Sequence, residues 1–155
     1  MIGRKNHSRD GRRVILFVCG HNAGRSQMAQ AFFNTLKRDY PHVDAAYEAV
    51  SVGTRPGLEL NSAVVKAMQE IGIDMHSISY FPKALSHELI TSHAKRIVRA
   101  IVACDDTCVL PEGIDATIEH WNLPDPARQP LETIRSIREE VRQKVTTLLE
   151  ELAAS

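Results

Sequence analysis

The stretch Val14-Ile15-Leu16-Phe17-Val18-Cys19-Gly20-His21-Asn22-Ala23-Gly24-Arg25-Ser26 decides the fold of this chain. Its opening residues are apolar and partly β-branched, which predicts a strand buried on both faces. The chain then breaks into a loop rich in glycine and asparagine, and a helical pattern follows over residues 26–34. The stretch therefore predicts a strand, a loop and a helix in direct succession.

The loop has the composition of an anion-binding site. Gly20 and Gly24 can adopt backbone angles closed to other residues, and Asn22 tolerates them, so successive N–H groups can converge on one point. The N-terminus of the following helix adds partial positive charge at that point. We therefore predict that consecutive residues bind an oxyanion, namely Gly20, His21, Asn22, Ala23, Gly24, Arg25 and Ser26. His21 either packs within the loop or orients the bound ion.

Cys19 opens this loop and Arg25 closes it. A helix N-terminus and a neighbouring cation both favour the thiolate form of a cysteine, and a guanidinium can donate two N–H groups to a tetrahedral oxyanion. A cysteine that ends a buried strand is, taken alone, more often a small packing residue. An arginine in a purely structural turn, however, would stay unpaired. We interpret the loop as holding an oxyanion against a nucleophilic sulfur.

Composition limits the remaining possibilities. We expect residues 1–13 to form a flexible basic N-terminal tail and residues 14–155 a single catalytic α/β domain. Lys+Arg and Asp+Glu both number 19, so the charge gives no case for binding nucleic acid, and the longest apolar run is too short to cross a membrane. Three cysteines without a preceding secretory segment indicate a reducing, cytoplasmic location and reactive thiols.

Further strands are predicted over residues 47–54, 97–103 and 117–121. Helices are predicted from a cap at Asn61 or Ser62 to about residue 71, over 86–92 and over 131–152. This alternation predicts an α/β fold with three layers, in which helices flank a four-stranded parallel sheet. Parallel strands end at one edge of the sheet, where ligands bind. That edge should collect four reactive residues: Cys19, Cys104, Cys108 and Asp125.

Four segments together resemble one known family. The loop and helix start at residues 19–29, the Ser51–Thr54 stretch, the cysteine pair after the third strand and the Leu123–Ala127 segment are similar to the arsenate reductases that share the low-molecular-weight protein tyrosine phosphatase fold. The resemblance covers residues 14–152. The Cys-x5-Arg-Ser loop and the Asp-Pro pair are common to reductases and phosphatases of that fold. Gln27, the His-Asn-Ala-Gly spelling and the two additional cysteines are typical of the reductases.

The resemblance implies a role for each matching residue. Cys19 would attack arsenate, or a phosphate-like oxyanion, while the loop N–H groups and Arg25 hold its charge. Ser26 would hydrogen-bond the thiolate, and Asp125 would act as the general acid for the departing oxygen. Hydrolysis of the resulting sulfur-bound arsenate would only return arsenate. Reduction therefore requires a second thiol.

Cys104 is the natural second thiol, and Cys108 could then pass the disulfide to thioredoxin or to a low-molecular-weight thiol. The order of the two, and whether either is idle, stays open because Ala103–Val109 departs from the Gly-Cys-Gly-Asp-x-Cys-Pro run of relatives. No organic cofactor is implied. No metal is predicted, because Cys-x3-Cys lacks a second ligand pair for zinc, and Gln30 stands where some relatives use an acidic residue to hold potassium.

Two alternatives remain at this stage. The first is a low-molecular-weight tyrosine phosphatase that forms a phosphocysteine; Ala127 and Arg128 stand where such enzymes usually carry aromatic residues. The second is a non-catalytic module that binds an oxyanion or arsenite through its thiols. Mere binding would need no general acid, so the presence of Asp125 beside Cys19 and Arg25 argues against that module.

Overall fold

The computed structural model describes residues 11–76, 80, 82, 96–104, 110 and 114–155. This part of the chain contains a four-stranded sheet in the order β2-β1-β3-β4, and every neighbouring pair is parallel. The strands are β1 (Arg13–Cys19), β2 (Tyr47–Gly53), β3 (Ile97–Val102) and β4 (Thr117–His120). The predicted parallel sheet is confirmed, and each strand matches its predicted range to within one residue.

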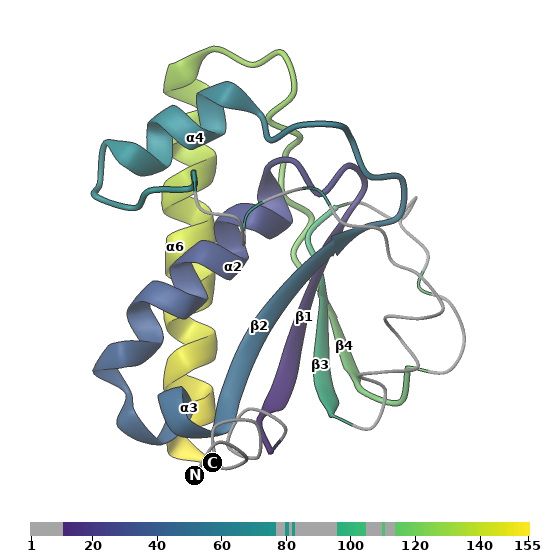
Figure 1. Cartoon of the computed structure of the whole chain (residues 1–155), viewed down its shortest axis with the longest axis vertical. Helices are drawn as coiled ribbons and strands as arrows, with labels where there is room; N and C mark the ends of the chain where they lie inside the picture. The colour runs from purple at the N-terminus through teal and green to yellow at the C-terminus, as the bar shows by residue number, and fades with distance from the viewer. Residues whose placement is uncertain (1–10, 77–79, 81, 83–95, 105–109, 111–113) are drawn as a thin grey trace, which may run out of the picture.

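The helices of the described residues lie together on one side of this sheet (Figure 1). They are α2 (Arg25–Leu36), the short 3-10 helix η1 (Lys37–Asp39), α3 (Pro41–Ala46), α4 (Ser62–Gln69) and α6 (Leu131–Ala154). The helix predicted over residues 86–92 lies outside the described residues, as does most of the predicted N-terminal tail. The chain thus has the predicted α/β fold, a four-stranded parallel sheet flanked by helices.

The central strand β1 is buried on both faces. On β1, residues 14–18 are fully buried and Cys19 is 2 % exposed. Alternate side chains of a strand point to opposite faces, so Ile15 and Phe17 join the core shared with the helices while Leu16 and Val18 join a second apolar cluster. This confirms the prediction of a strand with no solvent-facing side. The regular apolar stripe of α6 is buried in the first core.

The ends of the helices follow signals in the local sequence. Asn61 caps α4, its side-chain oxygen accepting from the N–H groups of Ala63 and Val64 at 2.9 and 3.2 Å. Gly72, at φ +84°, then lets the chain turn away beyond the helix. Pro41 is the first residue of α3, a short helix that was not predicted; proline is favoured at this position because the N–H that it lacks would be unpaired there anyway.

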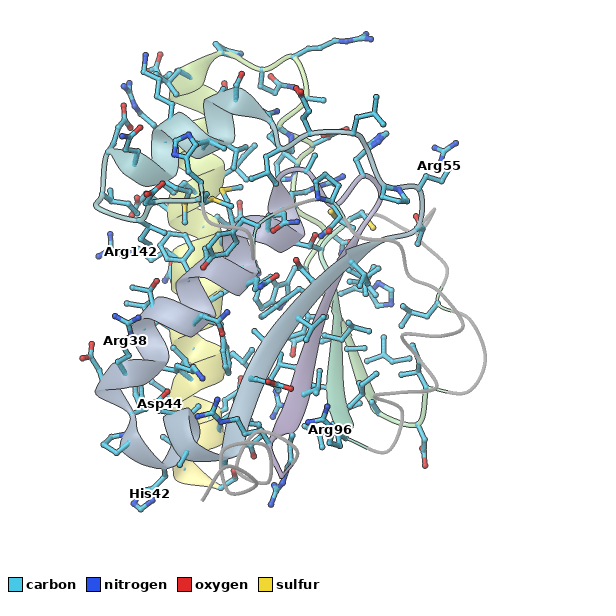
Figure 2. All side chains as sticks on the ribbon, in the orientation of Figure 1. Arg38, His42, Asp44, Arg55, Arg96 and Arg142 are labelled. Carbon is cyan, nitrogen blue, oxygen red and sulfur yellow. The ribbon has the colours of Figure 1, made fainter. Side chains whose placement is uncertain are left out.

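The two ends of the sheet differ in character. Figure 2 shows Arg96 at the end where the strands begin and Arg55 at the end where they finish. Arg96 pairs with Glu48 there at 3.4 Å, an ordinary structural contact. Among the described residues, no helix is long and apolar enough to cross a membrane. In a parallel sheet, ligands bind at the end where the strands finish, so the candidate active site is expected at the Arg55 end.

Candidate active site

The predicted loop joins β1 to α2 at the carboxyl edge of the sheet. Cys19 is the last residue of β1, and Arg25 is the first of α2 (Figure 1). Asn22, inside the loop, has φ +52°, the left-handed conformation that asparagine tolerates better than most residues. The prediction of a strand, a tight loop and a helix in succession is confirmed.

The carbonyl groups of the loop face a neighbouring segment. Four of them accept backbone hydrogen bonds of 2.8 to 3.0 Å: Cys19 from Thr54, Gly20 from Arg55, His21 from Gly57 and Ala23 from Asn61. In a trans peptide the N–H points opposite to the carbonyl before it. The loop N–H groups are therefore turned away from residues 54–61. Of these groups, the Asn22 N–H donates to Cys19 Sγ at 3.2 Å, so the N–H side of the loop faces the sulfur.

The sulfur of Cys19 lies among hydrogen-bonding groups. Its Sγ is 2.9 Å from Ser26 Oγ, and the Asn22 N–H donates to it at 3.2 Å. Asn22 Nδ2 in turn donates to Ser26 Oγ at 2.7 Å. Asn22 and Ser26 are fully buried. The Cys19 sulfur thus accepts a hydrogen bond from the backbone of Asn22 and lies within hydrogen-bonding distance of the Ser26 hydroxyl.

Arg25 connects this loop to a second one. Its side chain is largely buried, and its Nη1 donates to the carbonyl of Leu123 at 3.1 Å. Leu123 stands two residues before Asp125, so the guanidinium is anchored between the oxyanion loop and the Asp-Pro loop.

A small cavity lies between the two loops. Its volume is about 70 Å³, and its lining residues are Cys19, His21, Ala23, Gly24, Arg25, Asn61, Asp125, Pro126 and Ala127. Larger hollows of about 330 and 480 Å³ lie against α6 and α4, and neither is lined by Cys19. One water occupies about 30 Å³ in the liquid. The cavity at Cys19 therefore suits a small ion. It is lined by a thiol and a guanidinium, which the two larger hollows lack.

Asp125 is held at the rim of this cavity. Its Oδ1 accepts from the N–H of Ala127 at 3.0 Å, which closes a tight turn. The residues that flank the loop, Asn122 and Arg128, have φ values of +50° and +61°. The fold thus brings Asp125 to the same cavity as Cys19, although more than a hundred residues separate them in the sequence.

Cys104 follows β3 at the same edge. The N–H of Ala103 donates to the carbonyl of Val18 at 2.7 Å. Cys19 directly follows Val18 and Cys104 directly follows Ala103, so the two cysteines continue neighbouring strands at the same edge of the sheet. Cys104 is buried and disulfide-bonded, whereas Cys19 is a free thiol. Cys108 lies outside the described residues.

Two residues of this region were missed as parts of the site. Sequence analysis treated Asn61 only as a helix cap, but it also lines the cavity and its Nδ2 lies 3.5 Å from the carbonyl of Pro126. Gln27 served only as a family marker, yet it is fully buried and hydrogen-bonded to Asn22. An asparagine before a helix signals a cap whether or not a site is near, so only the tertiary contact identifies it.

A parallel α/β sheet whose first strand ends in a Cys-x5-Arg loop, opposite an Asp-Pro loop, defines a class of enzymes that act on tetrahedral oxyanions through a cysteine. The chain belongs to one family of that class, the low molecular weight phosphotyrosine protein phosphatases, whose family model matches residues 14–155. This family also contains arsenate reductases, and the chain resembles those.

Several similar proteins are arsenate reductases of this family. A putative arsenate reductase of Halobacterium salinarum is 31% identical over 144 residues, which cover 93% of this chain and 96% of the relative. Arsenate reductase 1 of Staphylococcus epidermidis is 31% identical over 140 residues, covering 88% and 95%. The glutaredoxin arsenate reductase of Synechocystis is 29% identical over 142 residues, covering 91% and 99%.

Solved structures give the same fold. An arsenate reductase in the phosphate binding state aligns with a TM-score of 0.73 and 28% identity, over 90% of this chain and 98% of the other. The YwlE arginine phosphatase from Geobacillus stearothermophilus aligns with a TM-score of 0.73 at 24% identity, over 92% and 94%. Because a reductase and a phosphatase align equally well, the fold alone does not select the reaction.

Proposed function

We propose that this protein reduces arsenate to arsenite through a thiol relay that begins at Cys19. The observation that carries the proposal is the position of the Cys19 sulfur, which lies beside a cavity for one small ion with Arg25 and Asp125 on its walls. Ser26 and the Asn22 N–H stabilise the thiolate that must attack.

The first step forms a bond between sulfur and arsenic. The Cys19 thiolate attacks arsenate while the loop N–H groups and the Arg25 guanidinium neutralise its oxygens. One arsenic–oxygen bond breaks, and Asp125 gives the departing oxygen a proton so that it leaves as water. Arsenic keeps its oxidation state in this step, since a sulfur ligand has simply replaced an oxygen ligand.

The second step transfers the electrons. The Cys104 thiolate attacks the Cys19 sulfur, and the electron pair of the sulfur–arsenic bond passes to arsenic, which leaves as arsenite. Two thiolates are thereby oxidised to one disulfide and arsenic is reduced by two electrons. Cys104 is buried at the same sheet edge as Cys19, which supports its choice as the attacking thiol.

Regeneration requires an external thiol. Cys108 attacks Cys104 and carries the disulfide to the outside, where thioredoxin, glutaredoxin or a small thiol reduces it. A cycle that consumes thiols fits the reducing conditions of the cytoplasm.

The phosphatase is the second candidate, because a phosphatase shares this fold at a comparable TM-score. The substrates of a phosphatase carry a leaving group that must be held beyond the phosphoryl group. The described lining offers Pro126 and Ala127 beside Asp125, and no phenylalanine, tyrosine or tryptophan. This lining favours a bare oxyanion over an aryl phosphate.

The decisive experiment counts free thiols on the fully reduced protein before and after one exposure to arsenate without external reductant, with arsenite assayed in the same tube. Loss of two thiols with one equivalent of arsenite is the expected result, and peptide mapping identifies the pair. Intact thiols and no arsenite, even after a small thiol is added, would favour the phosphatase. Cys108→Ser should stop turnover after one cycle, and unchanged steady-state turnover would remove Cys108 from the relay.

A further inference from the structure

Gln27 lies in the first turn of α2, fully buried, and the chemistry described so far gives it no task. Its Nε2 is 3.0 Å from the backbone carbonyl oxygen of Asn22 and 3.0 Å from the side-chain Oδ1 of the same residue. One amide group thus holds both the main chain and the side chain of the residue that sits in the left-handed conformation inside the oxyanion loop.

These contacts fix the direction of each hydrogen bond. A backbone carbonyl can only accept, so the Gln27 atom that faces it must be the NH₂ group. Two NH₂ groups would repel each other, so the Asn22 atom beside that group must be Oδ1. The Asn22 NH₂ then necessarily points the other way, toward Ser26 Oγ, to which it donates at 2.7 Å.

The orientation of the Asn22 amide determines where the Ser26 hydroxyl can donate its hydrogen. Since Ser26 Oγ accepts from Asn22, its own hydrogen has to point elsewhere, and Cys19 Sγ lies 2.9 Å away. Among the described contacts of the Ser26 hydroxyl, this sulfur is the partner that can receive that hydrogen. If Asn22 presented its oxygen to Ser26 instead, the hydroxyl would donate to Asn22 and the sulfur would lose a donor.

We propose that Gln27 is a positioning residue for Cys19, one that fixes the Asn22 amide so that the Ser26 hydroxyl donates to the Cys19 sulfur. The inference rests on the proposed function only in taking Cys19 as the reactive thiol. It does not depend on the thiol relay, on the electron donor or on the choice between arsenate reduction and phosphate ester hydrolysis.

The test measures the rate of Cys19 alkylation by iodoacetamide against pH, in a Cys104→Ser/Cys108→Ser background so that Cys19 is the thiol that reacts. The titratable and charged side chains that line the cavity, His21, Arg25 and Asp125, are identical in all variants. Gln27→Met keeps the bulk of the side chain but removes both donated hydrogen bonds. Gln27→Leu serves as the second variant where Gln27→Met folds poorly, as judged by its melting curve.

We expect Gln27→Met to raise the pH midpoint of alkylation by about half to one unit, and to slow alkylation near neutral pH by about three- to tenfold, the scale of one ordinary intramolecular hydrogen bond. In a Ser26→Ala background the same substitution should have no further effect, since Gln27 acts through Ser26. Gln30→Met is the matched control: Gln30 is also a largely buried glutamine of α2, but it pairs with Ser51, and its loss should leave the midpoint in place.

Three outcomes would overturn the inference. A Gln27→Met protein that melts earlier with an unmoved alkylation midpoint would show that the residue only packs the helix. Equal shifts with and without Ser26 would show that Gln27 does not act through that hydroxyl. If the parent protein has a low alkylation midpoint and Gln27→Met leaves it unchanged, only this inference is contradicted. If the parent midpoint is about 8.5, that of a free cysteine, the proposed nucleophile is contradicted as well.

Discussion

Arg25 donates a hydrogen bond of 3.1 Å to the carbonyl of Leu123, and this contact joins two loops that are almost a hundred residues apart in the sequence. One loop carries the cysteine and the other carries the aspartate. The same guanidinium lines the cavity between them. We therefore propose two tasks for Arg25: it binds an oxyanion through its planar N–H groups, and it holds the two loops together.

Replacing Arg25 by lysine should weaken both effects, although the charge is kept. An ammonium is a point charge and cannot supply the planar pair of N–H groups that matches a tetrahedral oxyanion. We expect kcat/KM for arsenate to fall by about 10² or more, the scale of one lost oxyanion donor. Arg55→Lys, at an exposed position of the same region, is the control and should change the rate by less than about twofold. Equal effects of the two substitutions would contradict the role of Arg25.

Asp125→Asn isolates proton donation from loop structure. Asparagine can still accept the hydrogen bond from the Ala127 N–H, so the turn is retained while the acidic proton is lost. We expect the single-turnover rate of arsenite formation to fall by about 10²- to 10⁴-fold, as for a lost general acid. Rapid quenching of stoichiometric protein with arsenate measures it. An unchanged rate constant would exclude Asp125 from the chemistry.

Gly24 lies so close to Pro126 of the Asp-Pro loop that a side chain at this position would not fit. A Cβ built at this position would lie 2.7 Å from Cγ of Pro126, closer than real contacts allow. Gly24→Ala should therefore displace the Asp-Pro loop and lower kcat/KM by about 10²-fold, the order expected from a misplacement of about 1 Å. Gly57→Ala is the matched control, because its Cβ would meet nothing closer than 3.9 Å. A Gly24→Ala protein with full activity would show that the loops can separate without cost.

Glu70 makes stability depend on pH. Hydrogen bonds from Arg135, reinforced by Arg138, lower the pKa of its carboxyl from 4.5 to about 2 and join α4 to α6. A carboxyl whose pKa is depressed in the folded state contributes stability above its unfolded pKa and loses that contribution as the pH falls toward its folded pKa. The stabilisation should therefore be complete above about pH 5 and disappear between pH 4.5 and about 2.

Melting temperatures of Glu70→Gln against the parent protein test this expectation. The difference should be largest near neutral pH and should vanish toward pH 2. Glu150→Gln is the control, since Glu150 is exposed and has no ion pair among the described residues. A difference between Glu70→Gln and parent that stays constant from pH 7 to pH 2 would show that the charge of Glu70 is not the cause.

The sequence by itself determined the elements and their alternation. The apolar run of residues 14–19 identified a strand buried on both faces, and the spacing of Ile134, Ile137 and Val141 identified the long helix, because side-chain periods of 2 and 3.6 are visible in one dimension. The Cys-x5-Arg spacing indicated an oxyanion loop for a similar reason: a nest of N–H groups and a helix N-terminus are local features. Among the described residues, the short elements η1 and α3 were not predicted.

The tertiary structure alone decided which side chains meet. Nothing in the sequence pairs Arg25 with the carbonyl of Leu123, because that contact depends on where two loops end after separate crossovers. Asn61 looks like any helix cap until the fold places it in the cavity. Gln27 looks like any polar helix residue, yet it is fully buried with its amide on Asn22. Hydrogen-bond direction and burial belong to the packed state, so they have no signature in the order of residues.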